Sequence, residues 1–167
     1  MNMTNSEKKI INMFYLNEIT RDHFIETYPI DLFQNSNYIY LSVREAFLKK
    51  DAEELNLALV LIVFNPSVVL KDEFVDLLCL LLRETWHMQH ENIVVVLENV
   101  RSPKSIDTLY DTAITKFDYL DYDDSLPLAI KCIYALGAIN TVYSKEKLKL
   151  LAKSNNPVIK KNAEKQL

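Results

Sequence analysis

The chain has 167 residues, of which 49% are hydrophobic and 25% are charged, and this length and composition are typical of one globular domain. Gly137 is the single glycine, where average usage would give roughly a dozen, so glycine-rich phosphate-binding loops are excluded and a turn-rich β-fold is unexpected. The same scarcity predicts that very little of the backbone adopts a positive φ. The net charge is −4, and seven lysines after residue 139 leave about −9 on residues 1–139, which argues against direct nucleic-acid binding.

Apolar residues recur at helical spacing along the whole chain. The pattern predicts ten helices, over residues 6–17, 20–28, 37–50, 52–64, 73–86, 88–101, 104–117, 126–139, 144–153 and 157–166. Pro103, Pro127 and Pro157 fall near helix starts, where proline removes no intrahelical hydrogen bond. Ser105, Ser125 and Ser144 are the predicted N-caps. The segment Leu57–Phe64 is apolar on every side, which predicts a central helix covered on both flanks.

The sequence predicts a cytoplasmic protein that does not enter a membrane. Its first residues interleave charged with apolar side chains, unlike a signal peptide, and the longest uncharged run, residues 55–70, is 16 residues and contains Pro66. Cys79 and Cys132 lie within helical patterns and are expected to be buried thiols in a reducing compartment, with a single disulfide as the alternative.

The C-terminal half contains an internal repeat. At an offset of 39, Leu97 aligns with Leu136, Ser105 with Ser144 and Leu109 with Leu148, and at an offset of 31 Cys132 aligns with Ala163. Chance alignment of apolar helices is the alternative. A repeat of two helices predicts an all-α fold of stacked antiparallel helix pairs, a HEAT-like α-solenoid of about 8–10 helices. We expect one domain over residues 1–167, with an N-terminal helical cap at 1–50 and helix pairs at 51–167.

The first copy of the repeat carries extra residues in an acidic and aromatic connection, residues 117–125. Close carboxylates repel one another, so a partner would relieve the cluster, and tyrosines with carboxylates suit a protein interface. The alternatives are a merely solvated loop and a calcium-binding loop. The glycine and the terminal glutamate that are usual in a calcium-binding loop are absent here. The predicted partner-binding residues are Asp118, Tyr119, Asp121, Tyr122, Asp123 and Asp124, with Asp111 nearby on the preceding helix.

A second cluster is R-E-T-W-H-M-Q-H-E, in which His87 and His90 are three residues apart. On one helix they would lie close enough to share a metal, but the spacing departs from that of zinc-protease helices, and we expect no metal and no cofactor. Trp86 and His87 are weaker candidates for partner binding, with core packing as the alternative for the tryptophan. No nucleophile motif is present, so the sequence does not favour an enzyme.

Four segments of the sequence carry a resemblance to a known family: R-E-T-W-H-M-Q-H-E-N-I, S-P-K-S-I-D-T-L-Y-D-T-A, F-D-Y-L-D-Y-D-D-S and A-I-K-C-I-Y-A-L-G-A-I. Together they resemble an all-helical, HEAT-repeat-like family of immunity proteins from bacterial polymorphic and contact-dependent toxin systems. The resemblance covers about residues 80–167 and rests mainly on W-H-x-x-H-E followed by F-D-Y-L-D-Y-D-D. Residues 1–50 do not share it.

The resemblance implies an antitoxin, a small cytoplasmic protein that binds the toxic C-terminal domain of a cognate toxin and neutralises it without catalysis. Such a toxin domain is expected to be basic, a nuclease being one candidate, and an acidic aromatic loop could fill a groove meant for nucleic-acid phosphate. The main alternative is a helical-repeat scaffold that joins cellular proteins without a toxin. A HEAT-like bilin lyase is the third, and its catalytic constellation is not found in the sequence.

Overall fold

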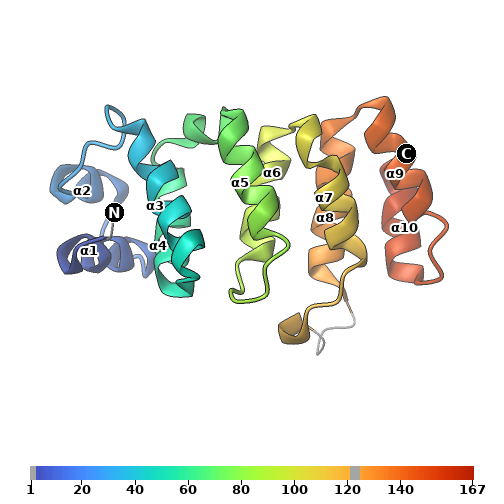
Figure 1. The fold of residues 1–167 in the computed structure, drawn as a ribbon, viewed down its shortest axis with the longest axis horizontal. Coiled ribbons are helices and arrows are strands. Elements are labelled where there is room, and N and C mark those ends of the chain that lie inside the picture. The colour runs from blue at the N-terminus through green and yellow to red at the C-terminus, as the bar shows by residue number, and fades with distance from the viewer. Residues whose placement is uncertain (1–2, 121–124) are drawn as a thin grey trace. The chain divides into compact units, whose positions relative to one another are not determined.

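The computed structural model describes residues 3–120 and 125–167, and the described residues are helical with no strand (Figure 1). The all-α prediction is therefore confirmed. The helices are α1 (Asn5–Tyr15), α2 (Arg21–Thr27), α3 (Ser36–Lys49), α4 (Ala52–Val60), α5 (Asp72–Leu81), α6 (His90–Val100), α7 (Ile106–Ile114), α8 (Pro127–Ile139), α9 (Val142–Leu151) and α10 (Pro157–Lys165). Four 3-10 turns accompany them: η1 (Leu61–Val63), η2 (Pro66–Leu70), η3 (Pro103–Ser105) and η4 (Asp118–Leu120).

Each predicted helix has its counterpart, and the largest differences lie at helix ends. Helix α5 ends at Leu81 and α6 begins at His90, so the intervening residues form a turn where the sequence predicts helix. Pro127 and Pro157 begin α8 and α10 as expected. Ser105 is the N-cap residue of α7 as predicted, although its side chain makes no cap hydrogen bond. The predictions of Ser125 and Ser144 were wrong, because Leu126 and Thr141 occupy the N-caps of α8 and α9.

Positive φ is rare among the described residues, as the single glycine predicts, but it does not fall on the glycine. Within residues 3–120 and 125–167, Gly137 does not have a positive φ, whereas five other residues do: Asn17, Lys50, Arg101, Leu126 and Asn140. Gly137 has a different role, since a Cβ there would lie 2.3 Å from Oε1 of Gln166. Its small size therefore allows the end of the chain after α10 to approach α8 closely.

Contacts divide the chain into two compact units, residues 1–71 and 72–167. In the first unit, α3 packs on α4 across the expected boundary at residue 50, and α1 packs on α2 and α4. Most of the segment 57–64 is buried, as predicted, although Val63 is 53% exposed. Rings of Phe14, Phe24 and Phe64 pack together, with centroids of the last two 4.0 Å apart.

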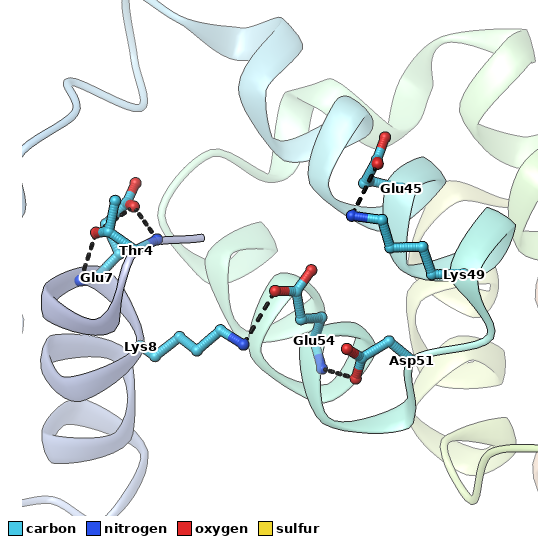
Figure 2. Close-up of polar contacts among 7 residues, drawn as sticks. All are labelled: Thr4, Glu7, Lys8, Glu45, Lys49, Asp51 and Glu54. Atoms are coloured by element: carbon cyan, nitrogen blue, oxygen red, sulfur yellow. Dashed lines mark hydrogen bonds and ion pairs between the residues drawn. The ribbon is translucent and has the colours of Figure 1, made fainter. Parts of the chain in front are cut away.

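Two neighbouring side chains tie α1 to the rest of the first unit. The carboxylate of buried Glu7 accepts hydrogen bonds from the Thr4 backbone N–H and hydroxyl, both at 2.6 Å, and from the Tyr38 hydroxyl of α3, also at 2.6 Å. Lys8 pairs with buried Glu54 of α4 at 3.0 Å, and Glu54 also donates its backbone N–H to the capping carboxylate of Asp51 (Figure 2). Polar contacts inside the core thus fix the position of α1.

In the second unit, helices pair as α5 with α6, α7 with α8 and α9 with α10 (Figure 1). Neighbouring pairs are joined by contacts of α6 with α8 and of α7 with α9. Ion pairs join the same helices: Glu91 of α6 pairs with Lys131 of α8, and Asp107 of α7 pairs with Lys147 of α9. The core of this unit is mostly apolar, and Leu97, Leu109, Leu136 and Leu148 are fully buried.

The two copies of the repeat share a local structure before α7 and before α9. Arg101 and Asn140, 39 residues apart, both end a helix in the left-handed conformation, at φ 55° and 52°. Four residues later, the buried hydroxyls of Ser105 and Ser144 donate to the carbonyls of Ser102 and Thr141, at 2.8 and 3.0 Å. The serines that align in sequence therefore make the same hydrogen bond, which supports the repeat.

Within the described residues, no helix is long and apolar enough to cross a membrane. Both thiols are free, so the alternative of a disulfide is not observed. Cys132 is buried as predicted, whereas Cys79 is partly exposed.

Glu7→Gln should destabilise the first unit by about 1.5–3 kcal/mol at pH 7, because charged hydrogen bonds are replaced by neutral ones in a buried site. Burial raises the pKa of Glu7, but the hydrogen bonds from Thr4 and Tyr38 outweigh burial and lower it below its usual value. The ionised carboxylate therefore stabilises the fold above the unfolded pKa, near 4.5, and the benefit disappears as pH falls through the lower folded pKa. Denaturant unfolding of E7Q and of exposed Glu53→Gln across pH 3–7 checks this; equal effects of the two would contradict it.

Arg101→Gly should raise stability by about 0.5–1 kcal/mol, because glycine adopts the left-handed conformation that a side chain disfavours at this helix end. Arg101→Ala removes the same side chain and keeps the unfavourable φ, so it should give no gain. Thermal or denaturant unfolding of both variants checks the difference, and equal stabilities would contradict the strain argument.

Candidate functional site

The turn between α5 and α6 and the segment after α7 carry the two motifs on which the sequence resemblance rests, and the structure brings them together. His87 lies in the turn, between the two helices as predicted, whereas His90 is the first residue of α6, so the two histidines do not share one helix. The two imidazoles stack with centroids 4.5 Å apart. Phe117 and Tyr119 also pack on His90, and the centroids of their rings lie 4.1 and 5.6 Å from that of the imidazole.

Hydrogen bonds determine which nitrogen of the buried His87 ring carries the proton. The backbone N–H of Gln89 donates to Nδ1 at 3.1 Å, so this nitrogen carries no proton. The proton is therefore on Nε2, which donates to the carbonyl oxygen of Leu81 at 3.0 Å. His87 thus joins the end of α5 to the turn that follows it.

His90 joins the turn to the segment after α7. Its Nε2 lies 2.8 Å from the carbonyl oxygen of Glu84, which can only accept, so Nε2 donates. Its Nδ1 lies 2.8 Å from the hydroxyl of Tyr119, and in the neutral ring this nitrogen accepts the phenolic proton. Residues 29 apart in sequence are thereby linked through a fully buried imidazole.

Burial keeps both rings neutral. It lowers the pKa of His87 below its usual value, and burial together with the neighbouring His87 lowers the pKa of His90 to about 4. Protonation would place two like charges on stacked rings inside the protein, which is unfavourable. All four ring nitrogens have hydrogen-bond partners, and the part of the chain that the structure describes contains no group of three metal-ligating side chains.

Asp118 and Asp111, both predicted to bind a partner, are exposed. Tyr119 is half-buried on His90 instead of being free for packing on a partner, so its part is to hold the segment in place. Asp121, Tyr122, Asp123 and Asp124 lie outside the described residues.

Trp86 and His87, the weaker candidates, lie side by side in the α5–α6 turn. His87 is 2% exposed and so cannot serve as a surface contact. Trp86 is half-buried, packs edge-on against His87 at 4.8 Å, and its indole N–H is buried without a hydrogen-bond partner among the described residues.

Sequence reasoning missed the part played by His90, which it considered only as a metal ligand. It also missed Phe117, which is 7% exposed and packs on His90. The aromatic residues beside the acids indicated that the segment is anchored. No spacing rule, however, connects Phe117 with His90, which lies far from it in the sequence. The structure supplies that connection.

Two hollows lie on either side of the anchored segment, which we define as residues Phe117–Leu120. A pocket of about 200 Å³ separates it from the α5–α6 turn and is lined by Thr85, Trp86, His87, Met88, Lys116, Phe117, Asp118 and Tyr119. A groove of about 420 Å³ lies toward the start of α8 and the α9–α10 turn. We call the surface formed by residues 84–89, 114–120 and 153–157 the turn face.

Because His90 is neutral in the folded protein, the stability of the fold depends on pH, and this dependence can be measured. Its folded pKa is below the unfolded value, so the unfolded chain binds a proton between about pH 6.5 and pH 4 while the folded chain does not. Stability should therefore fall as pH decreases through this window, by roughly 3 kcal/mol from His90. An NMR titration of the imidazole nitrogens should show the Nε2–H tautomer of His90 at pH 6, and titration near pH 6.5 would contradict the assignment.

Comparison of the chain with protein-family models, with curated proteins and with solved structures gave no match.

Proposed function

We propose that the chain is an immunity protein, which binds the toxic C-terminal domain of a cognate bacterial toxin through the turn face and thereby neutralises it. The proposal includes a HEAT-like stack of helix pairs and a cytoplasmic location, and it assigns no catalytic step. The single observation that carries it is the attachment of the acidic aromatic segment to buried His90, which joins the two motifs of the resemblance.

Anchoring supports binding because a held segment loses little conformational freedom when a partner docks. Tyr119 and Phe117 are held on the His90 ring, while Asp118 between them is exposed. The carboxylates of Asp118 and Asp111 have no ion pair among the described residues, unlike Asp76 and Asp107, which pair with lysines. The unpaired acids are therefore available to a basic partner.

The surface around the segment also has apolar side chains suited to an interface. Met88 is 69% exposed in the α5–α6 turn and Ile114 is 54% exposed at the end of α7. Exposed apolar residues beside unpaired carboxylates are typical of protein-binding surfaces. In our proposal the carboxylates attract a basic groove of the toxin and occupy it in place of its substrate.

The direct experiment is co-expression of the chain with the C-terminal toxin domain encoded upstream, scored by survival and by co-purification. Survival with a stable complex is the expected result. Continued killing with no complex would contradict the proposal and favour a scaffold without a toxin partner.

Replacing Asp118, Asp121, Asp123 and Asp124 by asparagine should slow association about tenfold or more at low salt and reduce the salt dependence of binding, because electrostatic attraction mainly sets the association rate. A matched control changes Glu18, Glu26, Glu53 and Glu146, which are exposed and lie elsewhere in the chain, to glutamine, and it alters the net charge equally. Stopped-flow association and circular dichroism separate loss of attraction from loss of folding. Equal effects of the two sets would show that only net charge matters.

A further inference from the structure

We infer that the pocket between the α5–α6 turn and the anchored segment binds the guanidinium group of one arginine of the partner. This inference rests on the proposed function for the identity of the partner. It adds a contact in which a side chain of the partner enters this chain, whereas the proposed function describes acids of this chain that occupy a groove of the partner.

The pocket is built from aromatic rings and one carboxylate. Trp86 and His87 line it from the α5–α6 turn, and Phe117 and Tyr119 line it from the anchored segment. Asp118 also lines the pocket, is exposed, and has no ion pair among the described residues. Aromatic faces attract cations through the ring quadrupole, and a carboxylate binds a guanidinium through charged hydrogen bonds. The lining therefore suits a flat cation, which can stack on a ring and still donate to the carboxylate.

The chain holds one of its own cations with the same kinds of group. The ammonium of Lys147 lies 4.8 Å from the ring centroid of Tyr110 and 5.1 Å from that of Tyr143. It also pairs with the carboxylate of Asp107 at 2.7 Å. Aromatic rings and an aspartate thus bind a side-chain cation elsewhere in this unit, which supports the same chemistry for the pocket.

Lys116 is the one cation in the lining of the pocket, and the acids near it in the sequence outnumber it. Lys116 is exposed, and among the described residues its ammonium makes no ion pair and lies over no aromatic ring. Between residues 111 and 124 the sequence carries five aspartates and this one lysine. Burial lowers the pKa of His87, so its ring adds no charge to the lining at pH 7. The pocket therefore attracts a cation more strongly than an anion.

The volume of the pocket limits its ligand to about one side chain. It is about 200 Å³, below the range of about 300–1,000 Å³ that is typical of pockets for small molecules. The hydrogen bonds of His90 hold the turn and the anchored segment, and so both sides of the pocket, in place. The indole N–H of Trp86 has no acceptor among the described residues, so no hydrogen bond opposes a movement of this ring onto a ligand.

The first test uses the chain alone and its single tryptophan as the reporter. N-acetyl-arginine methylamide is titrated while the fluorescence of Trp86 and the NMR signal of its indole N–H are followed. N-acetyl-citrulline methylamide is the neutral probe of matched shape, and N-acetyl-glutamate methylamide is the anionic probe. We expect saturable changes with the arginine compound at about 1–10 mM and none with the other two. No change with the arginine compound, or an equal change with either of the others, would overturn the inference.

Two variants that each remove one negative charge test the role of Asp118. Asp118→Asn removes the carboxylate of the lining, whereas Glu146→Gln removes an exposed carboxylate of the same unit outside the lining. We expect D118N to weaken binding of the arginine compound about fivefold or more, and E146Q to weaken it less than about twofold. Equal effects of the two variants would show that only net charge matters and would overturn the inference.

The same variants separate this inference from the proposed function when the toxin domain is present. We expect D118N to weaken toxin binding about tenfold and E146Q less than about twofold. Tight toxin binding that D118N weakens no more than E146Q does would overturn the pocket as a contact, while the proposed function stands. Binding of the arginine compound without any binding of the toxin domain would overturn the proposed function, and with it the assignment of the partner.

Discussion

The neutral imidazole of His90 is the interaction on which the turn face depends. It donates to the Glu84 carbonyl and accepts from the Tyr119 hydroxyl, so one buried ring holds the α5–α6 turn and the segment after α7 together. His87 stacks on it and binds the end of α5, which extends the connection into the helical core. Because each nitrogen has a defined donor or acceptor role, the arrangement requires uncharged rings. Burial keeps them uncharged, because it lowers the pKa of both histidines.

The anchored segment separates two hollows, and this arrangement explains how a short acidic stretch could form a specific interface. Attraction by carboxylates acts at long range and with little geometric preference, whereas specificity needs packed apolar contacts. The groove lined by Ile114, Leu126 and Ile159 provides an apolar contact on one side of the segment, and exposed Met88 provides another beside the pocket on the other side. Held in place before binding, the segment would present both its charge and its flanking hollows at a low entropic cost.

Much of the helical framework could be predicted from the sequence because it depends on local signals. Apolar periodicity located every helix of the described residues, and Ser105 and Ser144, which align in the sequence, make the same hydrogen bond in both copies of the repeat. The site could be predicted only in part. Asp118 is exposed as expected, but Tyr119 faces His90. A hydrogen bond between residues 29 apart follows from how α6 and α7 both pack on α8, and not from spacing. Left-handed residues such as Leu126 were missed because propensity assigns that conformation to glycine, and here packing overrides it.

The central claim is that the turn face is where the partner binds. Hydrogen–deuterium exchange of the chain, free and mixed with the toxin domain that we propose as its partner, tests it without any substitution. We predict that binding protects peptides covering residues 84–90 and 114–129 most strongly. Protection confined to residues 3–71, with these two regions unchanged, would contradict the claim.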